Sequence, residues 1–112
     1  MTTAIKLVQG DTKPSLNVTL LNEDTNTPIN LTGATIVMYF RESETVTLLD
    51  TLVATIVNAA AGTIIIPWNS DTLLVPEGTY EGEIEVTFSD GSVQSVFTPI
   101  YFALRAQFDD PV

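Results

Sequence analysis

The chain of 112 residues carries fourteen acidic and four basic side chains, a formal net charge of −10 at pH 7, and contains neither cysteine nor histidine. The lack of cysteine excludes disulfides and thiol chemistry, and the lack of histidine removes the commonest metal ligand and proton shuttle. Nucleic acids and anionic membranes are bound by neutralising their charge with lysine and arginine, so the composition predicts neither partner.

The length fits one domain whose core needs no disulfide or metal for stability. No stretch approaches the roughly 18 consecutive apolar residues of a membrane-spanning helix, and residues 1–6 lack the apolar centre of a signal peptide. We therefore expect a protein that is made and kept in the cytoplasm of its producer.

The first half of the chain predicts three strands. Residues 4–8 form a short apolar run that stops at the turn-forming sequence Gln-Gly-Asp, which indicates an edge strand. Residues 15–20 alternate between polar and apolar, as a half-buried strand does, and the polar residues 22–28 predict a solvated loop. Residues 29–33 predict a tight crossing segment that plugs one end of the core. Residues 34–42 favour a strand with one apolar face and a second face that is only partly polar, so we place this strand in the interior of a sheet.

The second half is less regular. Residues 48–57 predict a strand, and residues 63–68 predict another whose proline limits hydrogen bonding at its end. Helix-capping residues before an apolar cluster at 69–75 predict one short helical turn, which Pro76 ends. Alternation over residues 100–108 predicts the last strand.

The clearest signal is a hairpin late in the chain. From Tyr80 to Phe88, apolar or small residues alternate with polar ones, which is the period of a strand with one buried and one solvated face. Asp90 and Gly91 follow, and this dipeptide readily takes the positive φ angles of a type I′ turn. Residues 93–97 begin the return strand, so we predict an antiparallel hairpin.

Gly78 and Tyr80, at the start of this hairpin, match a tyrosine corner, in which a tyrosine returns its hydroxyl to nearby backbone in β-sandwiches. Strand signals recur about every ten residues, as they do in all-β sandwiches. We therefore predict one all-β domain over residues 1–112, with seven or eight strands in two packed sheets and a frayed tail at 109–112.

Three glutamates, Glu81, Glu83 and Glu85, form a stripe along one face of the predicted strand, with carboxylates about 7 Å apart. This spacing suits a glycosidase pair or a calcium ion, whereas a solvated face that opposes edge pairing needs no ligand. We favour the solvated face and predict no catalytic residue, no metal site and no cofactor. The sequence also lacks a Walker loop, a GxSxG elbow, a dinucleotide-binding glycine pattern and zinc-ligand spacing.

The aromatic side chains divide into candidates for the core and candidates for a partner surface. Trp68 ends a strand-like run and Tyr80 lies in the corner motif, so we predict both in the core. An exposed Trp68 would instead favour a glycan-binding surface. Tyr39, Tyr101 and Phe108 fall on outer faces or near the end of the chain, and we predict them at a protein-binding surface.

Five short motifs stand in a defined order and spacing along the chain. They are VQGDT at 8–12, NLTGATI at 30–36, AGT at 61–63, PEGTY at 76–80 and FSDGSVQ at 88–94. The ordered set, within residues 5–104, resembles the immunoglobulin-like domain at the N-terminus of the upper baseplate protein of lactococcal phages, a domain also found in many small phage proteins.

The resemblance implies an immunoglobulin-like antiparallel β-sandwich that is a structural protein of a bacteriophage virion. It implies attachment by protein–protein contacts to the capsid, as a decoration protein, or to the tail tip or baseplate. The implied partners are other virion proteins, with homo-oligomers in the symmetric particle. Larger family members continue into receptor-binding domains, whereas this chain stops at Val112, which favours a decoration, adaptor or tail-tip role. A small glycan- or host-surface-binding adhesin module is the alternative.

Overall fold

Eleven β-strands, with the turns between them, make up the secondary structure of residues 4–22, 24–96 and 98–108, which this computed structural model describes; no helix occurs among those residues. The strands in chain order are β1 (Ile5–Val8), β2 (Leu16–Thr19), β3 (Leu21–Asn22), β4 (Thr27–Pro28), β5 (Thr35–Glu42), β6 (Leu48–Val53), β7 (Thr55–Asn58), β8 (Thr63–Ile66), β9 (Gly78–Thr87), β10 (Val93–Ser95) and β11 (Ile100–Arg105). The protein is therefore all-β, as its sequence predicts.

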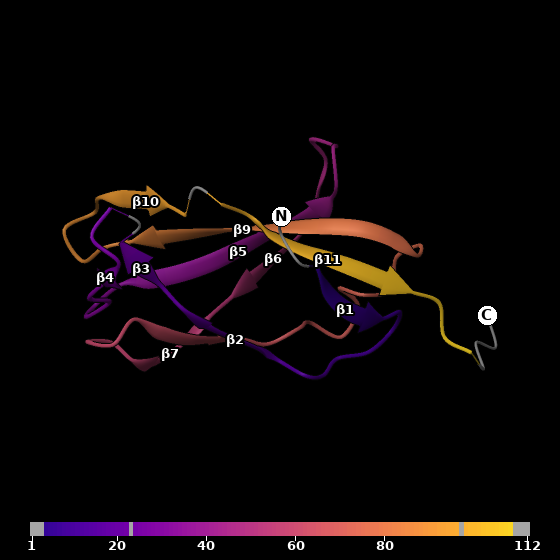
Figure 1. Ribbon diagram of the computed structural model, residues 1–112, viewed down its shortest axis with the longest axis horizontal. Helices are drawn as coiled ribbons and strands as arrows, with labels where there is room; N and C mark the ends of the chain where they lie inside the picture. The colour runs from indigo at the N-terminus through magenta and orange to yellow at the C-terminus, as the bar shows by residue number, and fades with distance from the viewer. Residues whose placement is uncertain (1–3, 23, 97, 109–112) are drawn as a thin grey trace.

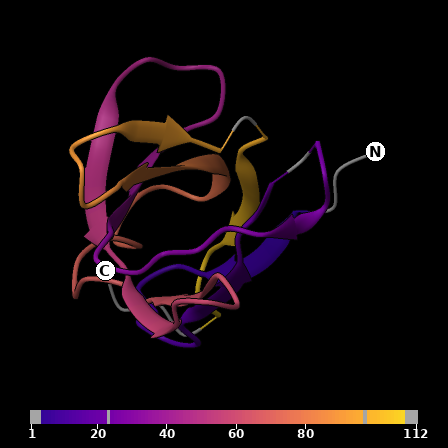
Figure 2. The ribbon, with the colours of Figure 1, turned by 90° about the vertical axis from the view of Figure 1, so that its left-hand side faces the viewer.

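Two main sheets face each other across a shared core (Figures 1 and 2). The larger sheet has the strand order β1-β11-β9-β5-β6, and β10 pairs with β9 as its sixth strand. The smaller sheet has the order β2-β8-β7, while β3 and β4 form a separate two-stranded ladder. The predicted positions of β1 at an edge and of β5 in the interior of a sheet are both confirmed.

One strand pair departs from the antiparallel arrangement that the sequence predicts. β1 runs parallel to β11, with Ile5 opposite Phe102 and Leu7 opposite Leu104, whereas the other described pairs are antiparallel. Strands joined by a tight turn must run antiparallel, but β1 and β11 lie near opposite ends of the chain, so no hairpin sets their direction. The parallel pairing buries both leucines in the core.

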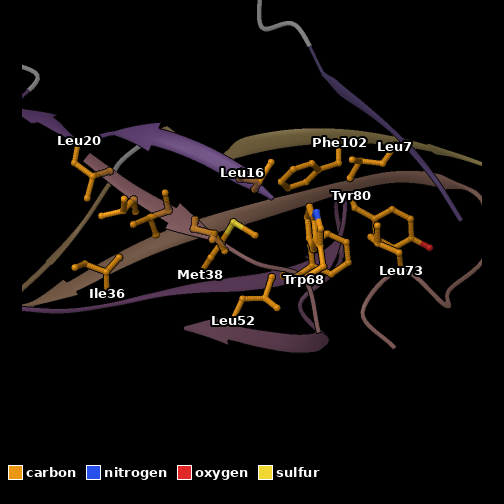
Figure 3. Packing of buried hydrophobic residues seen from close by; sticks show 14 of the residues in the cluster. Leu7, Leu16, Leu20, Ile36, Met38, Leu52, Trp68, Leu73, Tyr80 and Phe102 are labelled. Atoms are coloured by element: carbon orange, nitrogen blue, oxygen red, sulfur yellow. The ribbon is translucent and has the colours of Figure 1, made fainter. Parts of the chain in front are cut away.

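Four aromatic rings meet in the core (Figure 3). Phe40 stacks on Tyr80 with ring centroids 5.3 Å apart, and it meets the edge of Trp68 at 5.8 Å. Phe102 lies 5.7 Å from Phe40 and 5.5 Å from Trp68. The Trp68 side chain is only 6% exposed, and its indole N–H donates to the carbonyl of Pro14 at 3.0 Å. The predictions that Trp68 and Tyr80 lie in the core are confirmed.

Aliphatic side chains from both sheets and from the segments between strands surround these rings (Figure 3). They are Leu7, Leu16, Leu20, Leu31, Ile36, Met38, Leu52, Ile64, Ile66, Leu73, Ile84, Val86 and Leu104. Leu31 belongs to the predicted crossing segment and is completely buried, so that segment does close one end of the core.

The tyrosine corner is confirmed at the entry to β9, the longest strand. The Tyr80 hydroxyl donates a hydrogen bond to the carbonyl of Pro76, four residues earlier in the chain. Gly78 is the first residue of β9, so the corner holds the chain where it enters the sheet. Burial, together with the nearby charge of Glu42, raises the pKa of the Tyr80 hydroxyl above its ordinary value.

The strand count exceeds the predicted seven or eight for two reasons. The stretch predicted as one strand at 48–57 changes sheets at Ala54, whose N–H donates to Ile36 of β5 at 2.9 Å, so it forms β6 in the larger sheet and β7 in the smaller. In the stretch predicted as a loop at 22–28, Asn22 and residues 24–28 are exposed, as expected, but Leu21 and Asn22 pair with Pro28 and Thr27 to form the β3–β4 ladder.

The turn of the late hairpin differs from the type I′ turn that the sequence predicts. The N–H of Gly91 donates to Phe88 at 2.9 Å, and the N–H of Phe88 donates to Ser92 at 2.8 Å, so three residues form the loop. Gly91 has a φ of 89°, whereas Asp90 is not in the positive-φ region. The Asp90 carboxylate accepts from the hydroxyl of Ser92 at 2.6 Å and from the N–H of Ser92 at 2.9 Å. These local bonds favour the wider turn, and the hydroxyl bond and then the N–H bond lower the pKa of Asp90.

Two further predictions need correction. The segment at 69–75 forms turns rather than a helical turn. The N–H of Thr72 donates to the carbonyl of Asn69, and the N–H of Asn69 donates to the Thr72 hydroxyl at 3.1 Å.

The last strand ends at Arg105 and does not reach Phe108. The Arg105 guanidinium lies 4.3 Å from the centre of the Phe108 ring, outside the sheet. The tail predicted at 109–112 lies outside the described residues.

Candidate protein-interaction surface

The outer face of the larger sheet brings together polar and aromatic side chains from β5, β9 and β11. Glu81 of β9 lies opposite Arg41 of β5 and opposite Tyr101 of β11, so these residues form a row across three strands. In the next row Glu83 lies opposite Tyr39. Successive residues of a strand point to opposite faces, and the residues between these glutamates are buried in the core. We call the following residues the outer-face cluster: Tyr39, Arg41, Glu81, Glu83, Glu85 and Tyr101.

Two of the three glutamates are held by side chains of the neighbouring strand β5. Arg41 reaches Oε1 of Glu81 through Nε and Nη2, both at 2.7 Å. The Glu81 side chain is 12% exposed and that of Arg41 46%, so this ion pair lies partly within the sheet surface. The Tyr39 hydroxyl donates to Oε1 of Glu85 at 3.0 Å. That hydrogen bond, with burial and the charges of Glu85 and Glu83, raises the pKa of Tyr39.

The third glutamate, Glu83, lines a hollow of about 180 Å³ beside these pairs. Its side chain makes no hydrogen bond or ion pair with the part of the chain that the structure describes. The loop between β5 and β6, which projects from the sheet in Figure 1, contributes Val46, whose side chain is 93% exposed. The residues around the hollow are Tyr39, Arg41, Val46, Leu48, Glu81, Gly82, Glu83 and Pro99.

The hollow can receive one side chain of a protein partner. Val46 and Leu48 supply apolar contact, and Glu83 supplies an acidic group at the same place. Lysine and arginine combine an apolar stem with a cationic end, and both bury the stem while the charge stays near solvent. The hollow therefore suits a basic side chain, and the net charge of −10 of the chain also favours a basic group.

The residues predicted for a partner surface do not all lie together. Tyr39 and Tyr101 are half-buried on the outer face, on either side of β9. Phe108 lies beyond the end of β11, is 93% exposed and contacts Arg105. The structural residues Gly78, Tyr80, Asp90 and Gly91 shape the ends of β9 and do not belong to the outer-face cluster.

Sequence reasoning did not single out Arg41, Val46 or Leu48 for this surface. Alternation along residues 34–42 does place Arg41 on the same face as Tyr39, which is a usable signal. The partner of Arg41 could not be read from the chain, because forty residues separate it from Glu81.

The structure also bears on sugar binding at Trp68, on metal binding by acidic side chains and on membrane-spanning helices. A sugar platform built on Trp68 required that residue to be exposed, and Trp68 is buried. Within residues 4–22, 24–96 and 98–108, no group of three or more acidic side chains is placed to hold a metal ion. No helix long and apolar enough to cross a membrane occurs in the same described ranges.

A comparison with protein-family models found no match to the chain, and a search of curated proteins found no similar sequence.

Proposed function

We propose that this protein is a structural component of a bacteriophage virion. In this proposal it is an immunoglobulin-like β-sandwich that attaches by protein–protein contacts to the capsid, or to the tail tip or baseplate. Its partners are other virion proteins, and it acts through shape and contact rather than catalysis.

The observation that carries the proposal is the position of the five motifs that resemble the phage domain. Each motif contains a glycine at a turn or strand entry, and four of these glycines have φ angles between 71° and 89°: Gly10, Gly33, Gly62 and Gly91. At Gly62, an added Cβ would lie 2.6 Å from the carbonyl oxygen of Leu20, so a larger residue would displace backbone. The motifs therefore mark the bends of this sandwich, which supports reading them together as a fold signature.

The corner formed by Tyr80 and Pro76 supports the immunoglobulin-like assignment. Tyrosine corners are a hallmark of β-sandwiches of that class, where they fix the chain at the start of a strand. The corner lies in the fourth of the five motifs, at the start of β9, the central strand of the larger sheet.

The outer-face cluster supports attachment by protein contact. Tyr39 and Tyr101 offer aromatic area with a polar end, a composition that is enriched at protein interfaces. The hollow beside Tyr39 and Glu83 suits a basic side chain of the partner. Repeated copies on a symmetric particle would gain avidity from an individual contact of this modest size.

The first experiment asks whether the chain is part of a phage particle. Virions from the strain that encodes the chain are purified on a density gradient, separated into heads and tails, and probed with an antibody against the purified protein. We expect the protein to migrate with intact particles and then with heads or with tails, which names the attachment site. Intact particles that contain none of it would overturn the proposal.

A second experiment asks whether the outer face makes the contact. The purified chain is added to particles that lack it, and binding is measured by co-sedimentation. We expect Tyr39→Ser combined with Tyr101→Ser to weaken binding at least about tenfold, a loss of about 1.4 kcal/mol. Leu74→Ser, at an exposed apolar residue outside the cluster, is the matched control and should bind normally. Normal binding by the double variant would exclude the outer face as the attachment surface.

A further inference from the structure

One free edge of each main sheet lies on the same stretch of chain. β6 is the last strand of the larger sheet and β7 the last strand of the smaller one, and only Ala54 separates them. One side of the sandwich is therefore a continuous run of edge strand over residues 48–58. Apolar side chains are exposed along it: Leu48, Leu49, Val53 and Val57.

The backbone of β6 offers hydrogen-bonding groups to a further strand. The N–H of Ala54 donates to the carbonyl of Ile36 at 2.9 Å, so these residues form a hydrogen-bonded pair. Bonded and non-bonded pairs alternate along an antiparallel ladder, and therefore Val53 and Thr51 turn their N–H and C=O groups away from β5. The N–H of Thr51 donates to Oδ1 of Asp50 at 2.8 Å, at the position where the carbonyl of an added strand would otherwise accept.

The other edge strands of the two sheets are shorter or guarded against pairing. β1 has four residues and carries Lys6, and β2 has four and follows Pro14. β7 has four residues with an irregular register at Ile56, and β10 has only three. β6 has six residues, and its one charged side chain, Asp50, turns to Thr72 and Asn69. Charges, prolines and short lengths are the usual protections of an edge strand, so β6 is the least protected edge in the described chain.

We propose that β6 pairs antiparallel with β6 of a second copy of this chain, which joins two larger sheets edge to edge. Residues 51–70 contain no charged side chain, although the whole chain carries a net charge of −10. Two such chains repel each other over most of their surface, and the uncharged edge is where they can approach. A cationic partner is instead attracted to the carboxylates of the outer-face cluster. The inference concerns the chain alone and does not depend on the virion proposal.

The pairing has a preferred register. A two-fold axis at Leu52 places Thr51 opposite Val53 of the second copy, so the outward backbone groups of Val53 and the carbonyl of Thr51 are used in both chains. The N–H of Thr51 joins this ladder by exchanging its bond to Asp50 for one to the carbonyl of Val53 of the second copy. The same axis places Asp50 opposite Ala54 of the second copy. An axis at Asp50 would instead set two carboxylates against each other, which is unfavourable between paired strands.

Sedimentation equilibrium of the purified chain tests the pairing. We expect a monomer–dimer equilibrium that strengthens several-fold between about 0.05 M and about 0.5 M salt, because salt screens the repulsion between acidic copies. Val53→Lys, at a position that is 63% exposed, should weaken the dimer at least about tenfold. The matched control is Val93→Lys on β10, where valine is 58% exposed, and it should leave the dimer unchanged.

Lysine at either site separates an effect on strand pairing from a general effect of charge. An added positive charge lowers the net repulsion between acidic chains, so a general charge effect would strengthen association at either site. Circular dichroism is used to check that each variant is folded. A wild-type chain that remains monomeric at about 1 mM in high salt, or a Val53→Lys variant that dimerises like the wild type, would overturn the proposal.

Disulfide cross-linking tests the register in a chain that has no cysteine of its own. Thr51→Cys and Val53→Cys copies are mixed and oxidised, because residues opposite each other in a bonded pair have Cα atoms about 5.5 Å apart, within the range of a disulfide. We expect the mixture to yield far more linked dimer than Thr51→Cys alone, whose cysteines would be diagonal neighbours about 7–8 Å apart. Equal yields from both samples would overturn this register.

Discussion

The two faces of the larger sheet are stabilised in different ways. On the inner face, Phe40 and Tyr80 pack against each other and against side chains from the smaller sheet and from loops. On the outer face, Glu81 and Glu85 each depend on one partner from the neighbouring strand. A residue inside has many neighbours and cannot change size freely, whereas a residue outside loses at most one pair. The same strands therefore combine a strictly specified core with a surface that is free to serve a partner.

Neighbouring residues of β5 give the most direct test of this comparison. Phe40→Ala removes a ring that contacts three other aromatic side chains, and should lower the free energy of unfolding by about 3–5 kcal/mol. Tyr39→Ala, one residue away on the outer face, loses chiefly its hydrogen bond to Glu85 and should cost about 1 kcal/mol.

Urea unfolding followed by fluorescence measures both values, and Phe40→Leu gives a milder inner variant if Phe40→Ala does not fold. Equal losses at Phe40 and Tyr39 would show that the two faces are not specified differently.

Gly82 provides a second test, on the inner side of β9. A Cβ at Gly82 would lie 2.6 Å from Sδ of Met38, so Gly82→Ala must push that side chain aside. Overpacking of this kind costs about 1–3 kcal/mol, and the flexibility of methionine favours the lower part of that range. Met38→Val removes the sulfur, and the double variant should therefore lose less stability than the sum of the single variants. Additive losses in urea unfolding would show that Met38 is not the cause.

The inner face was also the part of the fold that the sequence predicts best. Alternation placed Tyr80, Ile84 and Val86 on the buried side of one strand, and the corner motif placed the hydroxyl of Tyr80 against nearby backbone. Both signals are local, since they depend on residues within one strand or one turn. The change of sheet at Ala54 and the parallel pairing of β1 could not be predicted this way, because they depend on which distant strands meet.

The candidate surface shows the same limit. Tyr39 and Tyr101 were predicted on outer faces, and the structure brings them to the same face on either side of β9. The ion pair of Arg41 with Glu81 depends on the register between β5 and β9, which no local pattern contains. Phe108 was grouped with the tyrosines because it lies near the end of the chain, and alternation extended the last strand to it, but alternation does not show where a strand ends.

Asp50 is a polar exception near the inner face, and pH tests its role. Burial by itself raises the pKa of Asp50, but hydrogen bonds from Thr72, Asn69 and the N–H of Thr51 outweigh it, and the pKa is lowered overall. A carboxyl whose pKa is lowered by folding adds stability above its unfolded pKa of about 3.9, and that stability is lost as the pH falls through the folded value.

We expect Thr72→Val to cost about 1 kcal/mol at pH 7, with the difference from wild type shrinking below about pH 4. Urea unfolding at a series of pH values measures this. Thr19→Val, at an exposed position of β2, is the control and should show no such pH dependence. A difference at Thr72 that stays constant down to pH 2 would mean that the Asp50 carboxylate is not responsible.

The smallest expected effect is on the outer face, at the ion pair between Arg41 and Glu81. A double-mutant cycle with Arg41→Ala and Glu81→Gln should give a coupling of about 0.2–1 kcal/mol that decreases with salt, because the arginine is nearly half exposed. Glu83→Gln replaces Glu81→Gln in the control cycle and should show weaker coupling. A coupling above about 2 kcal/mol would place this pair among the strong, desolvated interactions of the core. With the expected small value, the outer face contributes little to folding, and its residues are free to change without loss of the fold.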